Sequence, residues 1–282
     1  MANGKERVGI VGAGRMGLAM LRHLVKKGYA VTVCDISDKQ REAARAIGAT
    51  IVAMPAEVGK ASDIVILGVG YDDEVEDVVF GANGLRDTMA PGAIIAVSST
   101  AKPDNMKALA ERIAAKGIAV VDAPICRGRF AADEGTLLAL VGGNADVVAR
   151  IRPVYATFAS DIVHLGEVGN GQVGKAINNL MLWFNAVGVM EAGRLAEKTG
   201  VDLVTLRDAL LTSSAASDSL KEWDRVSFTW ALKDMQIVTD MADKAGLSLP
   251  LTGAIKEVVK EARRVKASNP PNWTGNKPLK YE

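Results

Sequence analysis

The first half of the chain alternates between short apolar runs and longer stretches with helical spacing. The apolar runs lie at residues 8–11, 30–34, 50–52, 64–68, 93–97 and 118–121. Most are rich in β-branched residues and have few polar positions, which is typical of parallel strands covered on both faces. The segments between them have the period of amphipathic helices. This alternation predicts an α/β fold with an N-terminal, doubly wound domain of the Rossmann type.

The pattern changes near residue 165. Two more strand signals, 135–143 and 161–165, precede the change, and from Gly169 to near Ala267 the spacing is helical. A stretch without proline from Lys175 to Thr199 predicts a helix of roughly 37 Å, long enough to form the spine of a second domain.

We therefore predict two domains. Residues 1–165 form the Rossmann-type domain, and residues 166–282 form an all-α domain built on the long inter-domain helix. The tail from residue 269 is rich in Pro, Asn and Lys. We expect it to be extended, lying on another subunit or remaining mobile.

A glycine turn follows the first apolar run. Gly12, Gly14 and Gly17 have the G-x-G-x-x-G spacing of dinucleotide-binding turns. The first glycine permits the turn, the second removes a Cβ that would meet a pyrophosphate, and the third lets the next helix lie close to the strand. With Arg15 and Met16, these glycines form the predicted phosphate-binding segment.

Asp35 ends the second apolar run, about 20 residues after the glycine turn. A carboxylate at this place can accept hydrogen bonds from the adenosine ribose and would repel a 2′-phosphate, which favours NAD over NADP. The nearest arginine that could counter this preference is Arg41. The alternative is that Asp35 only caps the following helix.

The carboxyl ends of two further runs complete the predicted cofactor site. Gly68 and Val69 follow one run and Thr100 follows another, at the edge where open α/β sheets bind ligands. Ser98 and Ser99 can instead cap the helix that is predicted to begin near Pro103.

Composition narrows the classes of partner. The 282 residues include 34 basic and 33 acidic side chains, so no charge excess favours nucleic acid or an anionic membrane surface, and a small-molecule partner fits better. The apolar segments are too interrupted to predict a membrane span. Cys34 and Cys126 lack metal-ligand spacing and a secretory signal, which predicts free thiols, no bound metal and a cytoplasmic location.

Polar side chains begin the long predicted helix. Lys175 lies near its start, and Asn179 follows one turn later on the same face. The positive end of the helix dipole disfavours a charged lysine there, which would suit a proton acceptor. The alternative is an ordinary solvent-facing lysine.

The sequence resembles the β-hydroxyacid dehydrogenase family, which includes 3-hydroxyisobutyrate dehydrogenase and tartronate semialdehyde reductase. Five motifs occur in the family's order over nearly the whole chain: Gly12–Gly17, Ser99–Thr100, Asp122-Ala123-Pro124 with Gly135-Thr136-Leu137, Gly171–Asn179, and Lys233-Asp234-Met235.

The resemblance implies an NAD-dependent oxidoreductase that interconverts a small 3-hydroxy acid and its semialdehyde or keto acid. By the same resemblance, Lys175 is the catalytic acid/base, and Lys233 lies near both substrate and cofactor. Asn179 and the loop with Asp122, Cys126 and Gly128 bind the substrate. Relatives that decarboxylate carry a Glu where this chain has Leu182, so loss of CO₂ is not expected. Family members commonly form dimers or tetramers through the helical second domain, which implies a homodimer or homotetramer. By the same resemblance, residues 1–165 are the NAD-binding Rossmann domain and residues 166–282 the substrate and dimerisation domain.

The chain departs from the family in the substrate loop, where Cys126-Arg127-Gly128 stands in place of the usual Ser-Gly-Gly. One hypothesis is that Arg127 recognises an anionic group of the substrate, because its planar guanidinium suits carboxylate, sulfonate or phosphate. The other is that Arg127 points outward and Cys126 only replaces a better hydrogen-bonding residue.

Two other functions stay open for this fold, an imine reductase and a catalytically silent NAD(H)-binding protein. Imine-reducing and silent relatives lack the lysine that matches Lys175, so its presence favours the dehydrogenase. The identity of the hydroxy acid is not encoded in any motif.

Overall fold

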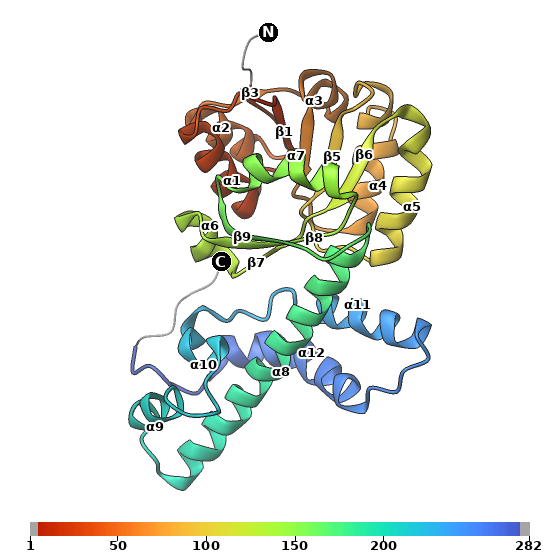
Figure 1. Ribbon diagram of the computed structural model, residues 1–282. Helices are drawn as coiled ribbons and strands as arrows, with labels where there is room; N and C mark the ends of the chain where they lie inside the picture. Colours follow the sequence, from red (N-terminus) through yellow and green to blue (C-terminus); the bar gives the residue numbers. More distant parts are fainter. Residues whose placement is uncertain (1–4, 277–282) are drawn as a thin grey trace. The chain divides into compact units, whose positions relative to one another are not determined.

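Six parallel strands organise the first part of the chain (Figure 1). The computed structural model describes residues 5–276. The strands have the order β3-β2-β1-β4-β5-β6, in which the chain builds outward on one side of β1 and then on the other, and ligands of such sheets bind at the carboxyl edge beside this switch point. Their bounds are β1 Val8–Val11, β2 Val31–Cys34, β3 Thr50–Ile51, β4 Ile64–Leu67, β5 Ile94–Val97 and β6 Ala119–Asp122.

Helices cover both faces of this sheet, as Figure 1 shows. They are α1 Arg15–Lys26, α2 Asp38–Ile47, α3 Pro55–Ala61, α4 Asp72–Phe80, α5 Pro103–Ile113 and α7 Ala145–Tyr155, with short 3-10 turns η1 Leu85–Asp87 and η2 Ala114–Lys116. Val8 and Ile10 of β1 face the core under α1 and α7, whereas Val11 faces the core under α3, α4 and α5. Burial on both faces explains why the strands read as apolar runs, and the predicted α/β fold class is confirmed.

A second sheet follows the first. Its three strands, β7 Ile125–Cys126, β8 Leu137–Val141 and β9 Ala159–His164, have the order β7-β8-β9. β7 is antiparallel to β8, and β8 is parallel to β9. The segment that was predicted as the substrate loop contains β7 and the start of helix α6, Gly128–Glu134; two strand residues and two helical turns give too short a pattern to detect.

The remaining elements are helical. They are α8 Asn170–Thr199, α9 Leu203–Leu210, α10 Asp218–Lys221, η3 Trp223–Arg225, α11 Ala231–Lys244 and α12 Pro250–Ser268. Contacts divide the chain into two compact units, residues 1–175 and 176–282. This division falls inside α8, whereas the predicted boundary at residue 165 precedes the helix; the boundary of the domains stays a prediction.

The second unit has its own apolar core, which includes Trp183, Trp223 and Trp273. The described part of the tail, 269–276, belongs to this core: Trp273 is buried and its indole donates to the carbonyl of Val189 at 3.0 Å. We expected this tail to lie on another subunit or to remain mobile, and for residues 269–276 that expectation was wrong. The tail packs on its own unit because burial of Trp273 removes a large apolar surface from water. Residues 277–282 lie outside the described part. No helix within residues 5–276 has the length and apolarity that a bilayer crossing needs.

Candidate active site

The glycine turn joins β1 to α1 and lies against the end of β4. Gly12 has a φ of 92°, and a Cβ built on it would lie 2.7 Å from the backbone of Gly68. A Cβ on Gly17 would lie 2.2 Å from the carbonyl oxygen of Gly12. The fold itself therefore requires glycine at both positions. A Cβ on Gly14 would meet no described atom within 4 Å, and this open space at the N-terminus of α1 fits a pyrophosphate.

The two residues inside the turn have different surroundings. Arg15 forms an ion pair with Asp133 of α6, and Met16 is half-buried and packs against the core of the first unit. Arg15 therefore links the glycine turn to α6.

Asp35 at the end of β2 faces the same turn. Its carboxylate accepts from the amide of Ala13 at 2.6 Å and from the amide of Ser37 at 2.8 Å. Arg41 donates to the backbone carbonyl of Asp35 at 2.7 Å and pairs with Asp38, so its guanidinium is already engaged by this chain. The side chain of Ile36, which sequence reasoning did not select, is 99% exposed beside the carboxylate. An aliphatic residue directly after the acidic one was the signal that could have found it.

The ends of β4 and β5 are fixed by their own side chains. Ser98 hydrogen-bonds to the hydroxyl of Tyr155 at 2.7 Å, and Ser99 donates to the carbonyl of Leu67 at 3.3 Å. Burial raises the pKa of the Tyr155 hydroxyl. These two serines thus have internal roles and do not cap α5. Thr100 follows them and is half-buried.

Gln172, in the first turn of α8, connects that helix to the loop that holds Thr100. Its amide nitrogen donates to the carbonyl of Ser99 at 2.7 Å, and its amide oxygen accepts from the backbone of Ala101 at 3.0 Å. The side chain is buried and both ends of its amide are satisfied. The residues on either side of Thr100 are therefore held by the helix that carries Lys175.

Asp122 has a different role from the predicted one. Its side chain is buried, and its two oxygens accept from the amides of Gly169 and Gln172, each at 2.7 Å. These are amides at the start of α8, which have no partner within the helix. A Cβ on Gly142 or on Gly171 would lie 2.6 Å or 2.8 Å from the carboxylate. Burial raises the Asp122 pKa and the backbone amides oppose this effect. Asp122 anchors α8 and is enclosed, so it does not present its carboxylate to a substrate.

Lys175 contacts the predicted substrate loop. Its Nζ donates to the carbonyl oxygen of Ile125 at 2.8 Å and lies 3.8 Å from the Sγ of Cys126. The structure therefore brings the predicted acid/base together with Cys126, and all of these groups belong to the first unit. Gly128, at the other end of the loop, has a φ of 71°.

Arg127 extends away from these groups along the second sheet. Its guanidinium contacts the carbonyl of Thr136, the hydroxyl of Ser160 and the carboxylate of Asp161. The structure thus does not bring the Arg127 side chain together with Lys175.

Two predicted site residues belong to the second unit. Asn179 lies on α8, one turn after Lys175, and its side-chain oxygen accepts from Asn178 at 3.0 Å. Lys233 lies on α11 with its Nζ 5.6 Å from the ring centre of Trp230.

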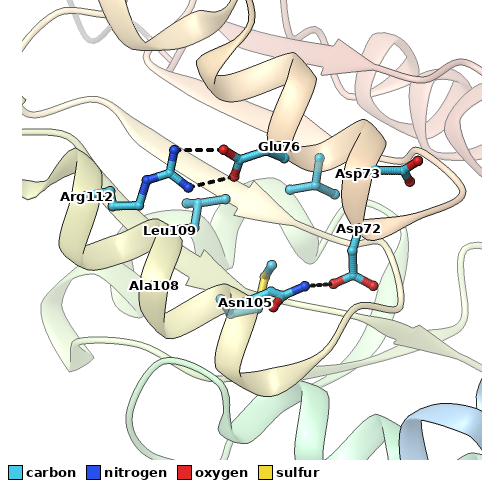
Figure 2. A pocket seen from close by; sticks show the side chains of 9 residues that line it. Asp72, Asp73, Glu76, Asn105, Ala108, Leu109 and Arg112 are labelled. Carbon is cyan, nitrogen blue, oxygen red and sulfur yellow. Dashed lines mark hydrogen bonds and ion pairs between the residues drawn. The ribbon is translucent and has the colours of Figure 1, made fainter.

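A pocket of about 230 Å³ lies between α4 and α5. Figure 2 shows two polar contacts among the residues that line it. One is a bidentate ion pair between Arg112 and Glu76, and the other is a hydrogen bond from Asn105 to Asp72. None of the predicted site residues lines it. Among the residues that the structure describes, no three His, Cys, Asp or Glu side chains are grouped so that they could hold a metal ion.

Two family models together match most of the chain. Residues 7–166 match the NAD binding domain of 6-phosphogluconate dehydrogenase, and residues 169–270 match the model described as NAD-binding of NADP-dependent 3-hydroxyisobutyrate dehydrogenase. The 2-hydroxy-3-oxopropionate reductase of Escherichia coli (strain K12) is 32% identical over 262 residues, which cover 89% of each chain.

Solved structures share the fold. The 3-hydroxyisobutyrate dehydrogenase of Mycobacterium tuberculosis with L-serine has a TM-score of 0.83 at 23% identity and covers 93% of this chain and 94% of its own. A structure of Psf3 with NADP⁺ and 2-OPP has a TM-score of 0.82 at 23% identity, covering 95% of this chain and 97% of its own. These two structures show the fold, and the two family models, both described as NAD-binding, show a nicotinamide cofactor.

Proposed function

The chain belongs to the β-hydroxyacid dehydrogenase family and is an NAD(P)-dependent hydroxyacid dehydrogenase, and we propose that it acts on a small 3-hydroxy acid with NAD⁺ and with Lys175 as the general acid/base. The product is the corresponding semialdehyde or keto acid, without loss of CO₂. One observation carries the proposal: the amine of Lys175 lies on the substrate loop, 2.8 Å from the carbonyl oxygen of Ile125, on a helix start that is tied to the Thr100 loop.

The proposed reaction combines a hydride transfer with a proton transfer, and the described residues suit both. When bound, the nicotinamide supplies the hydride acceptor. Lys175, when neutral, accepts the hydroxyl proton at Nζ, and in the reverse direction it returns this proton to the forming alkoxide. Asp122 and Gln172 fix the start of α8, so that the amine keeps its place relative to the Thr100 loop.

We propose that the residues of the cofactor site are those of the glycine turn, Asp35, the strand ends and Lys233, and that Cys126, Gly128 and Asn179 contact the substrate. The preference for NAD⁺ rests on Asp35, which faces the glycine turn, and on Arg41, which is engaged with Asp35 and Asp38. Ile36 offers an exposed apolar surface for an adenine ring. A homodimer or homotetramer in the cytoplasm remains the predicted working state.

The test measures reduction of NAD⁺ and NADP⁺ against a panel of 3-hydroxy acids, beside the variants Lys175→Met and Lys198→Met. Lys198 is an exposed lysine at the far end of the same helix and serves as the matched control. We expect turnover with NAD⁺ that falls by about 10²- to 10⁴-fold in Lys175→Met and is unchanged in Lys198→Met.

Other outcomes separate the alternatives. Reduction of cyclic imines that survives Lys175→Met would replace the proposal with an imine reductase. Tight NADH binding without turnover of any panel member would replace it with a silent binding protein. A higher kcat/KM with NADP⁺ than with NAD⁺ would overturn the cofactor preference alone.

A further inference from the structure

Arg127 has a backbone conformation that usually belongs to glycine. Its φ is 80° and its ψ is 2°, in the left-handed region. Among the residues that the structure describes, only Phe228 is another non-glycine residue with a positive φ. A side chain with a Cβ is disfavoured there, so other contacts have to hold Arg127 in place.

Those contacts come from Thr136, directly before β8, and from Ser160 and Asp161, near the start of β9. One guanidinium nitrogen of Arg127 donates to Thr136 O at 3.0 Å, Ser160 Oγ at 2.9 Å and Asp161 Oδ2 at 2.7 Å. Ser160 in turn donates to the same carboxylate oxygen at 2.8 Å. The hydrogen bonds from Ser160 and Arg127 hold the pKa of Asp161 below its usual value. Arg127 is thereby tied from the end of β7, across β8, to β9.

The other side of the same loop contacts Lys175. Ile125 and Cys126, the two residues before Arg127, supply the carbonyl oxygen and the sulfur that lie 2.8 Å and 3.8 Å from the lysine Nζ. A loop that turns differently at Arg127 would move these two groups. A change in the backbone conformation of Arg127 would therefore change the position of the Lys175 amine.

We propose that the Arg127–Asp161 pair is a positioning device, which holds the substrate loop in a glycine-like turn and so fixes Lys175, and that Arg127 does not bind the substrate. This inference rests on the proposed function. It also narrows the substrate class: with Arg127 paired with Asp161, the loop has no arginine side chain directed at Lys175 for a second anionic group, which suits a substrate with a single carboxylate.

The test compares Arg127→Ala, Arg127→Gly and Asp161→Asn with Arg112→Ala. Arg112 is the matched control because its pair with Glu76 is exposed to a similar degree, 50% and 49% against 43% and 52% for Arg127 and Asp161. The readouts are kcat, KM and the pH profile of kcat on substrates with one and with two anionic groups.

We expect Arg127→Ala to lower kcat/KM by roughly tenfold on both kinds of substrate and to shift the pH profile, because the tie is lost and the strained turn remains. Arg127→Gly recovers part of this loss, since glycine adopts the turn without a tie. Asp161→Asn causes a smaller loss, and Arg112→Ala leaves all three readouts unchanged. A loss in Arg127→Gly that is confined to substrates with two anionic groups would show that Arg127 binds the substrate, and would overturn the proposal.

A second measurement does not depend on activity. In a Cys34→Ser background, the rate at which a thiol reagent modifies Cys126 reports on the loop, because Cys126 is buried. We expect faster modification in Arg127→Ala and Asp161→Asn than in Arg112→Ala. Equal rates in all variants would overturn the positioning role. Faster modification of Cys126 in Arg127→Ala and Asp161→Asn, combined with no turnover of any hydroxy acid by the wild type, would support the positioning role and reject the proposed function.

Discussion

In the first unit two buried side chains, Asp122 and Gln172, hold loops at the carboxyl edge of the sheet, whereas in the second unit two buried indoles hold the described part of the tail, residues 269–276. Asp122 and Gln172 tie the start of α8 to neighbouring loops. Trp223 and Trp273 donate to the carbonyls of Pro271 and Val189, and so tie the tail to its own unit. The same kind of contact, a buried side chain bonded to a distant backbone group, thus fixes the start of the helix that carries Lys175 in one unit and anchors the tail in the other.

The largest expected effect on the free energy of unfolding is that of the substitution Trp273→Ala. The indole is 1% exposed and lies against Gly193, where a Cβ would come within 2.8 Å of its nitrogen. We expect the free energy of unfolding to fall by about 3–5 kcal/mol in a denaturant titration. In the control Trp230→Ala, which removes an indole that is 49% exposed, the loss should be near 1 kcal/mol or less. NADH affinity of folded Trp273→Ala should match the wild type; a parallel loss of affinity would mean that the tail also serves the cofactor site.

Asp122→Asn should have a smaller effect on stability and a clear effect on activity. The amide keeps one acceptor but turns an NH₂ group toward a backbone donor, so a buried amide of α8 loses its partner. We expect a loss of about 1–3 kcal/mol, together with a lower kcat because the start of α8 frays. Asp146→Asn is the control, since Asp146 is an exposed acid in the first turn of α7. Reduced stability with unchanged kcat would remove the positioning role.

The smallest expected effect is a pH dependence in the second unit. Burial lowers the pKa of Lys266 to about 8, and Asp224 opposes this shift. Because the folded pKa lies below the usual 10.5, the folded state releases the proton first, and stability should rise as the pH increases from about 8 to 10.5. The side chain is only partly buried, so we expect a rise of about 1 kcal/mol.

Denaturant titrations across this pH range check the Lys266 prediction. The Lys266→Met variant should lack the rise, and the exposed Lys260→Met should keep it. Equal slopes in the wild type and Lys266→Met would place the titrating group elsewhere.

Local sequence patterns were sufficient to predict several elements of the molecule. The run Val8–Val11 and the glycine spacing after it predicted β1, the turn and α1, because each depends on residues close in the chain. The same holds for Asp35 at the end of β2 and for the long helix that carries Lys175. The family resemblance, confirmed by the comparisons, also rested on such short motifs.

The partners of polar side chains followed a different rule. The sequence marked Asp122 and Arg127 as unusual, but only the tertiary structure decided that Asp122 anchors Gly169, 47 residues later, and that Arg127 pairs with Asp161, 34 residues later. The same is true of the pairing of β8 with β7 and β9, and of the tail that packs through Trp273. Helices and strands follow from the pattern of residues that are neighbours in the chain. The partner of a polar side chain depends instead on which distant segments the folded core brings together.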